Sequence, residues 1–136
     1  MISISADRSP RDRGETSAEA VLVLPVLILL VMVVLQSALY FHTAHVARAA
    51  AAEGAMAAAS YLVPGSSTTI TGSERAAAFV AEAGGRIDGA PRADFADGMV
   101  RVRVTLTVPS LVPFLSTRVT RDASEPKERV VTEVER

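Results

Sequence analysis

Residues 20–41 read AVLVLPVLILLVMVVLQSALYF and contain no charged side chain. As an α-helix that rises 1.5 Å per residue, this stretch extends about 33 Å, close to the roughly 30 Å hydrocarbon core of a bilayer. A helix buried in a soluble protein is rarely apolar on every face over such a length. The stretch from Ala20 to Phe41 therefore predicts one membrane-spanning helix.

The few unusual residues of this stretch are compatible with a membrane helix. Pro25 lies near its start, where few upstream carbonyl groups lose a hydrogen-bond donor and a kink is tolerated. Gln36 and Ser37 are its clearly polar members and lie toward its distal end. Tyr40 lies where an aromatic anchor at the membrane interface is expected.

Basic residues on the two sides of the apolar stretch predict its orientation. Arg8, Arg11 and Arg13 precede it, whereas Arg48 is the basic residue that follows it closely. Lysine and arginine are enriched on the cytoplasmic side of membrane helices. We therefore expect a cytoplasmic N-terminus and an extracytoplasmic C-terminal domain.

The helical pattern continues beyond the apolar stretch. Residues 42–62 are rich in alanine, the best helix former, and Pro64-Gly65 is a stop signal. We expect one long helix from about Ser17 to Leu62. Small residues recur along the alanine-rich part, at Ala47, Ala50, Ala51, Gly54, Ala55 and Ala58. They indicate either a face for close helix–helix approach or simply a helix favoured by alanine propensity.

A second, shorter helix is expected after a polar loop at residues 65–72. Ser73 is a candidate N-cap, and Gly84-Gly85 ends the pattern. Apolar residues spaced for one helix face, or lying at its exit, are Ala76, Phe79, Val80, Ala83 and Ile87.

The clearest strand runs from Met99 to Val108. Valine and leucine alternate with arginine and threonine along it, which is typical of an antiparallel strand with one wet face. Asp97-Gly98 is favoured in tight hairpin turns, so residues 92–96 are expected to form the preceding strand with Phe95 as its core residue.

The remaining residues predict a small sheet. Two prolines in the segment 109–115 prevent it from continuing a central strand, and residues 116–123 are expected to pair back onto residues 99–108. Residues 127–134 form either a last edge strand or a frayed tail. The predicted fold class is α+β and pilin-like: a long N-terminal helix, then a small domain of one helix packed on a short antiparallel sheet.

Composition argues against several classes of function. The chain has 136 residues, a net charge of −1 and no cysteine, so it has no basic patch for nucleic acid, no disulfide and no thiolate site. We find no arrangement of residues typical of catalysis, of cofactor binding or of a small-molecule substrate site. His42 and His45 have a spacing that can bind metal, but no further ligand is nearby, and two solvent-facing residues are the simpler interpretation.

A motif of specific interest precedes the apolar stretch: Gly14-Glu15-Thr16-Ser17-Ala18-Glu19. A carboxylate at the head of an apolar helix is costly to bury unless it is paired. The alternative is local, because Thr16 and Glu19 also have the spacing of a helix capping box.

This motif resembles a type IV prepilin-type leader, and Arg13-Gly14, Glu19 and the run from Ala20 to Pro25 are similar to the TadE-like minor pilins (pseudopilins) of tight-adherence pilus systems. The alanine-rich residues 46–55 also resemble the helix that follows the span in that family. The resemblance covers about the first 60 residues. It implies cleavage by a prepilin peptidase between Gly14 and Glu15, and pairing of Glu19 with the new amine of a neighbouring subunit.

The sequence thus predicts a non-enzymatic minor pilin of a Tad/Flp pilus or secretion assembly in the inner membrane. Its expected segments are a leader (1–14), a transmembrane helix (15–41), a helical extension (42–64) and an extracytoplasmic domain (65–136). The expected partners are the membrane, other pilins, the assembly machinery and the peptidase. Two alternatives are an unprocessed, membrane-anchored binding domain of the cell envelope and a domain secreted after removal of a signal peptide.

Overall fold

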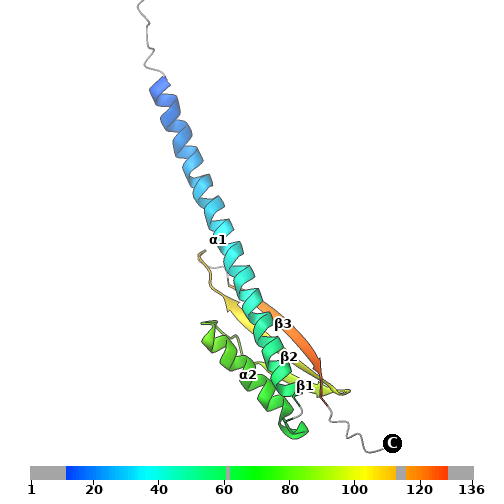
Figure 1. Cartoon of the computed structure of the whole chain (residues 1–136). Coiled ribbons are helices and arrows are strands. Elements are labelled where there is room, and N and C mark those ends of the chain that lie inside the picture. Colours follow the sequence, from blue (N-terminus) through cyan, green and yellow to red (C-terminus); the bar gives the residue numbers. More distant parts are fainter. Residues whose placement is uncertain (1–11, 61, 113–115, 129–136) are drawn as a thin grey trace, which may run out of the picture. The chain divides into compact units, whose positions relative to one another are not determined.

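The structure is a computed structural model that describes residues 12–60, 62–112 and 116–128, with side chains from residue 19 onward. Its elements are two α-helices, a short 3₁₀ helix and three strands (Figure 1). The chain divides into two compact units, Met1–Leu35 and Gln36–Arg136. The α+β class and the order of elements expected from the sequence are confirmed.

Helix α1 is longer than expected at its N-terminal end. It runs without interruption from Asp12 to Ala59 and includes Pro25. The helix begins five residues before the expected start, Ser17, and ends near the expected end, because the Pro64-Gly65 stop signal lies just beyond. Residues 1–11 lie outside the described part of the chain.

Helix α2, Thr68–Glu82, begins earlier than predicted. Residues 65–72 were expected to be a loop, but Gly65–Ser67 form the 3₁₀ helix η1 and Thr68 is already α-helical. Ser73 is therefore not an N-cap; it lies inside α2 and donates a hydrogen bond to the Ile70 carbonyl at 2.9 Å. Tertiary packing overrides the low helix propensity of the threonine-rich start, because Thr68 and Gly72 are both buried there.

The end of α2 is as predicted. Gly84 has a φ of +69°, its N–H donates to Ala81, and the Gly85 N–H donates to Val80 at 2.9 Å. These two hydrogen bonds form a Schellman motif, which favours glycine because the C′ residue, here Gly84, adopts a left-handed backbone conformation. Beyond it Ile87 forms an isolated bridge with Leu106.

The sheet is antiparallel with the order β1-β2-β3. Strands β1 (Arg92–Ala96) and β2 (Met99–Val108) have the predicted bounds, and β3 is Thr117–Pro126. The turn between β1 and β2 has positive φ at both Asp97 and Gly98, 54° and 74°, as the dipeptide predicted. Residues 127–128 are not in a strand, and 129–134 lie outside the described residues.

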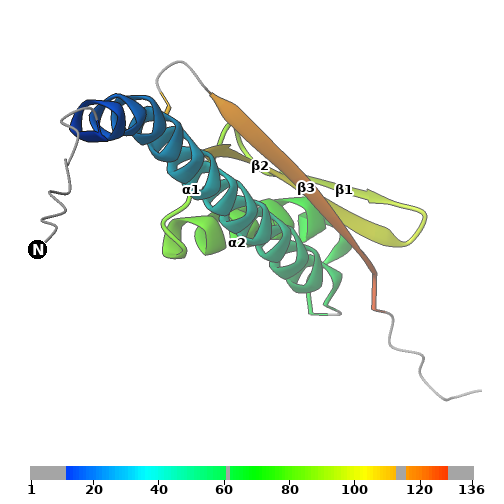
Figure 2. The ribbon, with the colours of Figure 1, turned by 90° about the horizontal axis from the view of Figure 1, so that it is seen from above.

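The core lies on one face of the sheet. Along β2 every second residue is buried, and the intervening arginine and threonine residues face outward. Figure 2 shows the two helices along the sheet, and the buried cluster joins alanines of α1, Ala76 and Val80 of α2, and the inward residues of β2. The prediction that Phe95 is a core residue is wrong. It pairs with Val100, but at the tip of an edge strand it remains 42 % exposed.

Candidate functional site

The predicted processing and pairing residues all lie in the first two turns of α1. Gly14, Glu15 and Glu19 are within the helix that begins at Asp12. Thr16 is inside the helix as well, whereas a capping box requires it at the N-cap position. This placement removes the local explanation for the spacing of Thr16 and Glu19.

Glu19 is exposed and makes no hydrogen bond or ion pair with any residue in the described ranges 12–60, 62–112 and 116–128. It immediately precedes the apolar run. Because none of the described side chains, from residue 19 onward, pairs with it, no described group of the chain neutralises this carboxylate in an apolar environment.

The apolar run of α1 is uncovered. Its large aliphatic side chains from Val21 to Leu35, Met32 apart, are between 48 and 73 % exposed. The most apolar window of the helix has a mean hydropathy of 2.8 and is not buried at all. The described chain therefore contains one helix long and apolar enough to cross a membrane.

Gln36 has a role that the sequence did not reveal. Its Nε2 donates to the Pro109 carbonyl at 3.3 Å, and its Oε1 accepts from the Leu111 N–H at 3.0 Å. The side chain thus satisfies two backbone groups of the segment that follows β2. A glutamine within an apolar stretch was the available signal, but its partner is more than 70 residues away in the sequence.

The two aromatic residues after Gln36 have different surroundings. Tyr40 is half-buried and packs against the core, whereas Phe41 is 62 % exposed. Their rings contact edge to face with centroids 5.7 Å apart. An anchoring role for Tyr40 stays a prediction, and of the pair Phe41 has the more exposed ring.

The small residues of α1 are used within the chain itself. Ala47, Ala50, Ala51, Ala55 and Ala58 are fully buried. A Cβ placed on Gly54 would lie 2.5 Å from the Gly72 carbonyl oxygen, and one on Gly72 would lie 3.2 Å from the Ala58 Cβ. Close helix–helix approach is therefore the correct interpretation of this pattern, and the neighbouring helix is α2.

An ion pair joins the two helices beside this contact. Arg75 of α2 donates from Nε at 3.0 Å and from a terminal nitrogen at 2.7 Å to the same Glu53 carboxylate oxygen. The hydrogen bond to Glu53 and then its negative charge raise the pKa of Arg75 above its ordinary value. Both side chains are partly exposed, so the pair contributes little to stability.

The C-terminus of α1 is capped by the chain's one lysine. Lys127 Nζ donates to the carbonyls of Ala58, Ser60 and Val63 at 2.9, 2.7 and 2.8 Å. The Glu128 N–H adds a bond to the Ala59 carbonyl at 2.9 Å. An ammonium group has three donors and interacts favourably with a helix C-terminus, so the three carbonyls satisfy all the donors of Lys127.

A pocket of about 510 Å³ lies within the second unit. It is lined by His42 and Val46 of α1, by the turn after α2 and by the end of β2. His42 and His45 are exposed, and no group of three or more metal-ligating side chains occurs in the described part of the chain.

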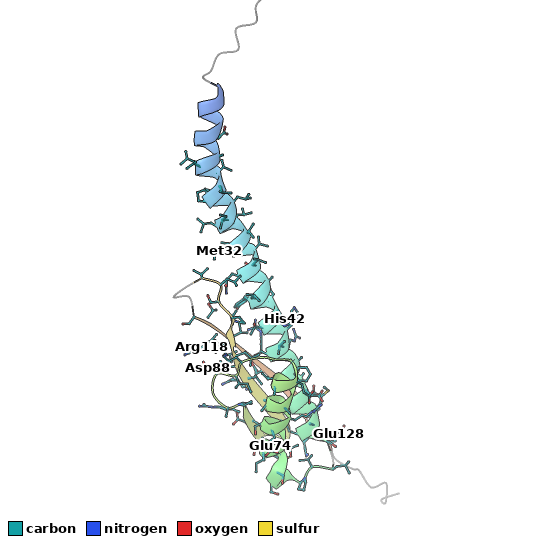
Figure 3. All side chains as sticks on the ribbon, turned by 90° about the vertical axis from the view of Figure 1, so that its left-hand side faces the viewer. Met32, His42, Glu74, Asp88, Arg118 and Glu128 are labelled. Atoms are coloured by element: carbon teal, nitrogen blue, oxygen red, sulfur yellow. The ribbon has the colours of Figure 1, made fainter. Side chains whose placement is uncertain are left out.

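Figure 3 shows Asp88 and Arg118, an ion pair that joins the turn after α2 to β3.

These features define a class of protein: an α+β domain whose first helix continues into one candidate membrane span. Residues 14–56 match the family model of TadE-like proteins, and this segment, about a third of the chain, is TadE-like. The match begins at Gly14 and includes Glu19, the apolar run and most of the alanine-rich helix.

The matched model is that of a family of Tad pilus components that is not known for enzymes, and the match is limited to residues 14–56. A comparison with curated proteins found no match, and a comparison with solved structures found none. The rest of the chain, from residue 57 onward, lies outside the family match.

Proposed function

We propose that this protein is a minor pilin, or pseudopilin, of a Tad pilus or a related secretion assembly. The observation that carries the proposal is an uncovered apolar helix within a TadE-like segment that starts at Gly14. Such a helix needs lipid before assembly and other apolar helices after it. The role is structural, with the domain on the extracytoplasmic side and the N-terminus in the cytoplasm.

The proposed processing step is cleavage between Gly14 and Glu15 by a prepilin peptidase. Cleavage removes the arginine-containing leader and leaves an amine at Glu15. The apolar helix can then leave the bilayer and pack among other pilin helices without carrying the leader arginines with it.

Glu19 is the proposed pairing residue. Its carboxylate is exposed and unpaired among the described residues, and it lies at the head of the apolar run. The free amine of a neighbouring subunit's Glu15 would neutralise it during assembly. A charge pair of this kind fixes the register of one helix against the next, because only one offset joins the two groups.

The test removes the Glu19 charge and measures partner recovery. Glu19→Gln keeps the size and hydrogen-bonding capacity of the side chain, and Glu19→Ala removes both. We expect both variants to insert into the membrane normally, while co-purification with other pilins falls about tenfold, equivalent to ~1.4 kcal/mol of association free energy. Glu74→Gln, at an exposed position of α2 (Figure 3), is the control. Normal recovery with both Glu19 variants would refute the pairing role.

A second candidate function is binding of a cell-envelope component by an unprocessed, membrane-anchored domain. The pocket beside His42 favours it, because a pilin that acts only through lateral helix packing does not need one. This alternative predicts a protein that keeps Met1 and functions without partner pilins.

A further inference from the structure

The segment that joins β2 to β3 carries exposed apolar side chains. Leu111 is 47 % exposed and Val112 is 38 % exposed. The sequence has no charged residue between Arg103 and Arg118. A short loop on a water-facing surface normally consists of polar residues, so apolar side chains at this position require an explanation.

Gln36 fixes the level of this segment along α1. Its carboxamide holds the Pro109 carbonyl and the Leu111 N–H with the two hydrogen bonds described above. Both interactions lie within the unit Gln36–Arg136. Leu111 is therefore held beside the first turn of the part of α1 that belongs to this unit.

That level lies on the membrane side of the expected interface. The predicted span ends at Phe41, whose exposed ring follows Gln36 by five residues, or about 7.5 Å along the helix axis. The aliphatic run that ends at Leu35 provides only about 24 Å from Ala20, less than the roughly 30 Å of a hydrocarbon core. A hydrocarbon core of about 30 Å that begins at Ala20 would extend past Gln36 toward Phe41.

We propose that Leu111 and Val112 insert into the outer interface of the same bilayer that α1 spans, so that the domain is held against the membrane at a second point. This inference rests on the membrane span of the proposed function. Lipid is the occupant because the level of Leu111 coincides with the end of the span, and because the preceding Pro109 and Ser110 carry no charge that would have to be buried. Gln36 would enter the bilayer with its carboxamide satisfied by the loop backbone.

The experiment uses the full chain, reconstituted alone into phosphatidylcholine–phosphatidylglycerol vesicles. Because the protein has no cysteine, single nitroxide labels can be placed cleanly with Val112→Cys, Leu27→Cys in the middle of the apolar run, and Ser66→Cys at an exposed position of η1. Collision rates with oxygen, which is enriched in lipid, and with a water-soluble nickel chelate then report the surroundings of each label.

We expect position 27 to be oxygen-accessible, position 66 to be nickel-accessible, and position 112 to resemble position 27 in its loss of nickel collisions. If position 112 resembles position 66 while 27 is in lipid, the insertion is refuted and the membrane span stands. If position 112 is shielded from both reagents, a second copy covers it and lipid is the wrong occupant. If position 27 is also in water, the span and the proposed function fail together.

A second variant tests the role of Gln36. Gln36→Leu, combined with the label at position 112, removes both hydrogen bonds and puts an apolar residue of similar helix propensity in place of glutamine. We expect the label to become more mobile, because the tether to α1 is lost. Unchanged mobility would show that Gln36 does not fix the loop and would overturn the argument from its level.

Discussion

At the scale of single residues, glycine at position 54 allows the two helices to approach. The ideal Cβ position at Gly54 is 2.5 Å from a backbone oxygen of α2 and 3.0 Å from the Ala76 Cβ. A backbone atom cannot move aside as a flexible side chain can. The small-residue pattern was visible in the sequence, but the identity of the facing helix was not, because the start of α2 was itself mispredicted.

We predict that Gly54→Ala lowers the free energy of unfolding by about 1–3 kcal/mol, because overpacking has to separate α1 from α2. This loss outweighs the gain of up to about 1 kcal/mol in helix propensity. Urea unfolding of the protein in detergent, followed by circular dichroism, measures the change. Gly65→Ala is the control, since a Cβ there meets nothing within 4 Å. Equal stability of the two variants would contradict the close approach.

At the scale of elements, the sequence predicted those features that depend only on neighbouring residues. The alternation along β2 and the Asp97-Gly98 turn both follow from period two and backbone conformation, and both were correct. The start of α2 was not, because burial of Thr68 and Gly72 outweighs their propensities. The partners of Gln36 and Lys127 are more than 60 residues distant in the sequence, and no local rule could assign them.

Strand β3 is an edge strand whose helix-facing side includes charged residues. Val119 is buried, whereas Arg121 and Glu125 on the same side are only half-buried. Inward-pointing charges at a sheet edge disfavour the addition of another strand. We therefore expect that no further strand is added to the sheet at the β3 edge.

We predict that Lys127→Met destabilises the junction of α1 with the sheet by about 1–3 kcal/mol, since three carbonyls lose a charged donor. Amide hydrogen exchange in the last turns of α1 should accelerate more than exchange in β2, which the substitution does not touch directly. Arg92→Met is the matched control, because it removes an exposed cation on β1. If both variants exchange alike, the capping role of Lys127 is wrong.

At the scale of the whole molecule, helix α1 has two parts that differ in composition and in burial. From residue 21 to residue 35 it is built of valine, leucine and other large aliphatic residues, which remain uncovered. From residue 44 to residue 59 it is largely alanine, and many of these residues are buried against α2 and the sheet. Large side chains suit contact with lipid, whereas small ones allow close packing of backbones.

The TadE-like segment spans this change, since it begins at Gly14 and ends at Met56. The match therefore covers the part of the chain proposed to be processed, to span the membrane and to join other pilins. The sheet and α2 lie outside it.

The most direct test of the proposed pilin function is the intact mass and N-terminal sequence of the protein extracted from membranes of its native host. We predict a chain that begins at Glu15, which establishes cleavage after Gly14. A chain that retains Met1, in a host with an active prepilin peptidase, would contradict the proposal and favour the unprocessed anchor. A chain that begins within residues 47–52 would mean that the apolar run is a signal peptide and would contradict both membrane functions.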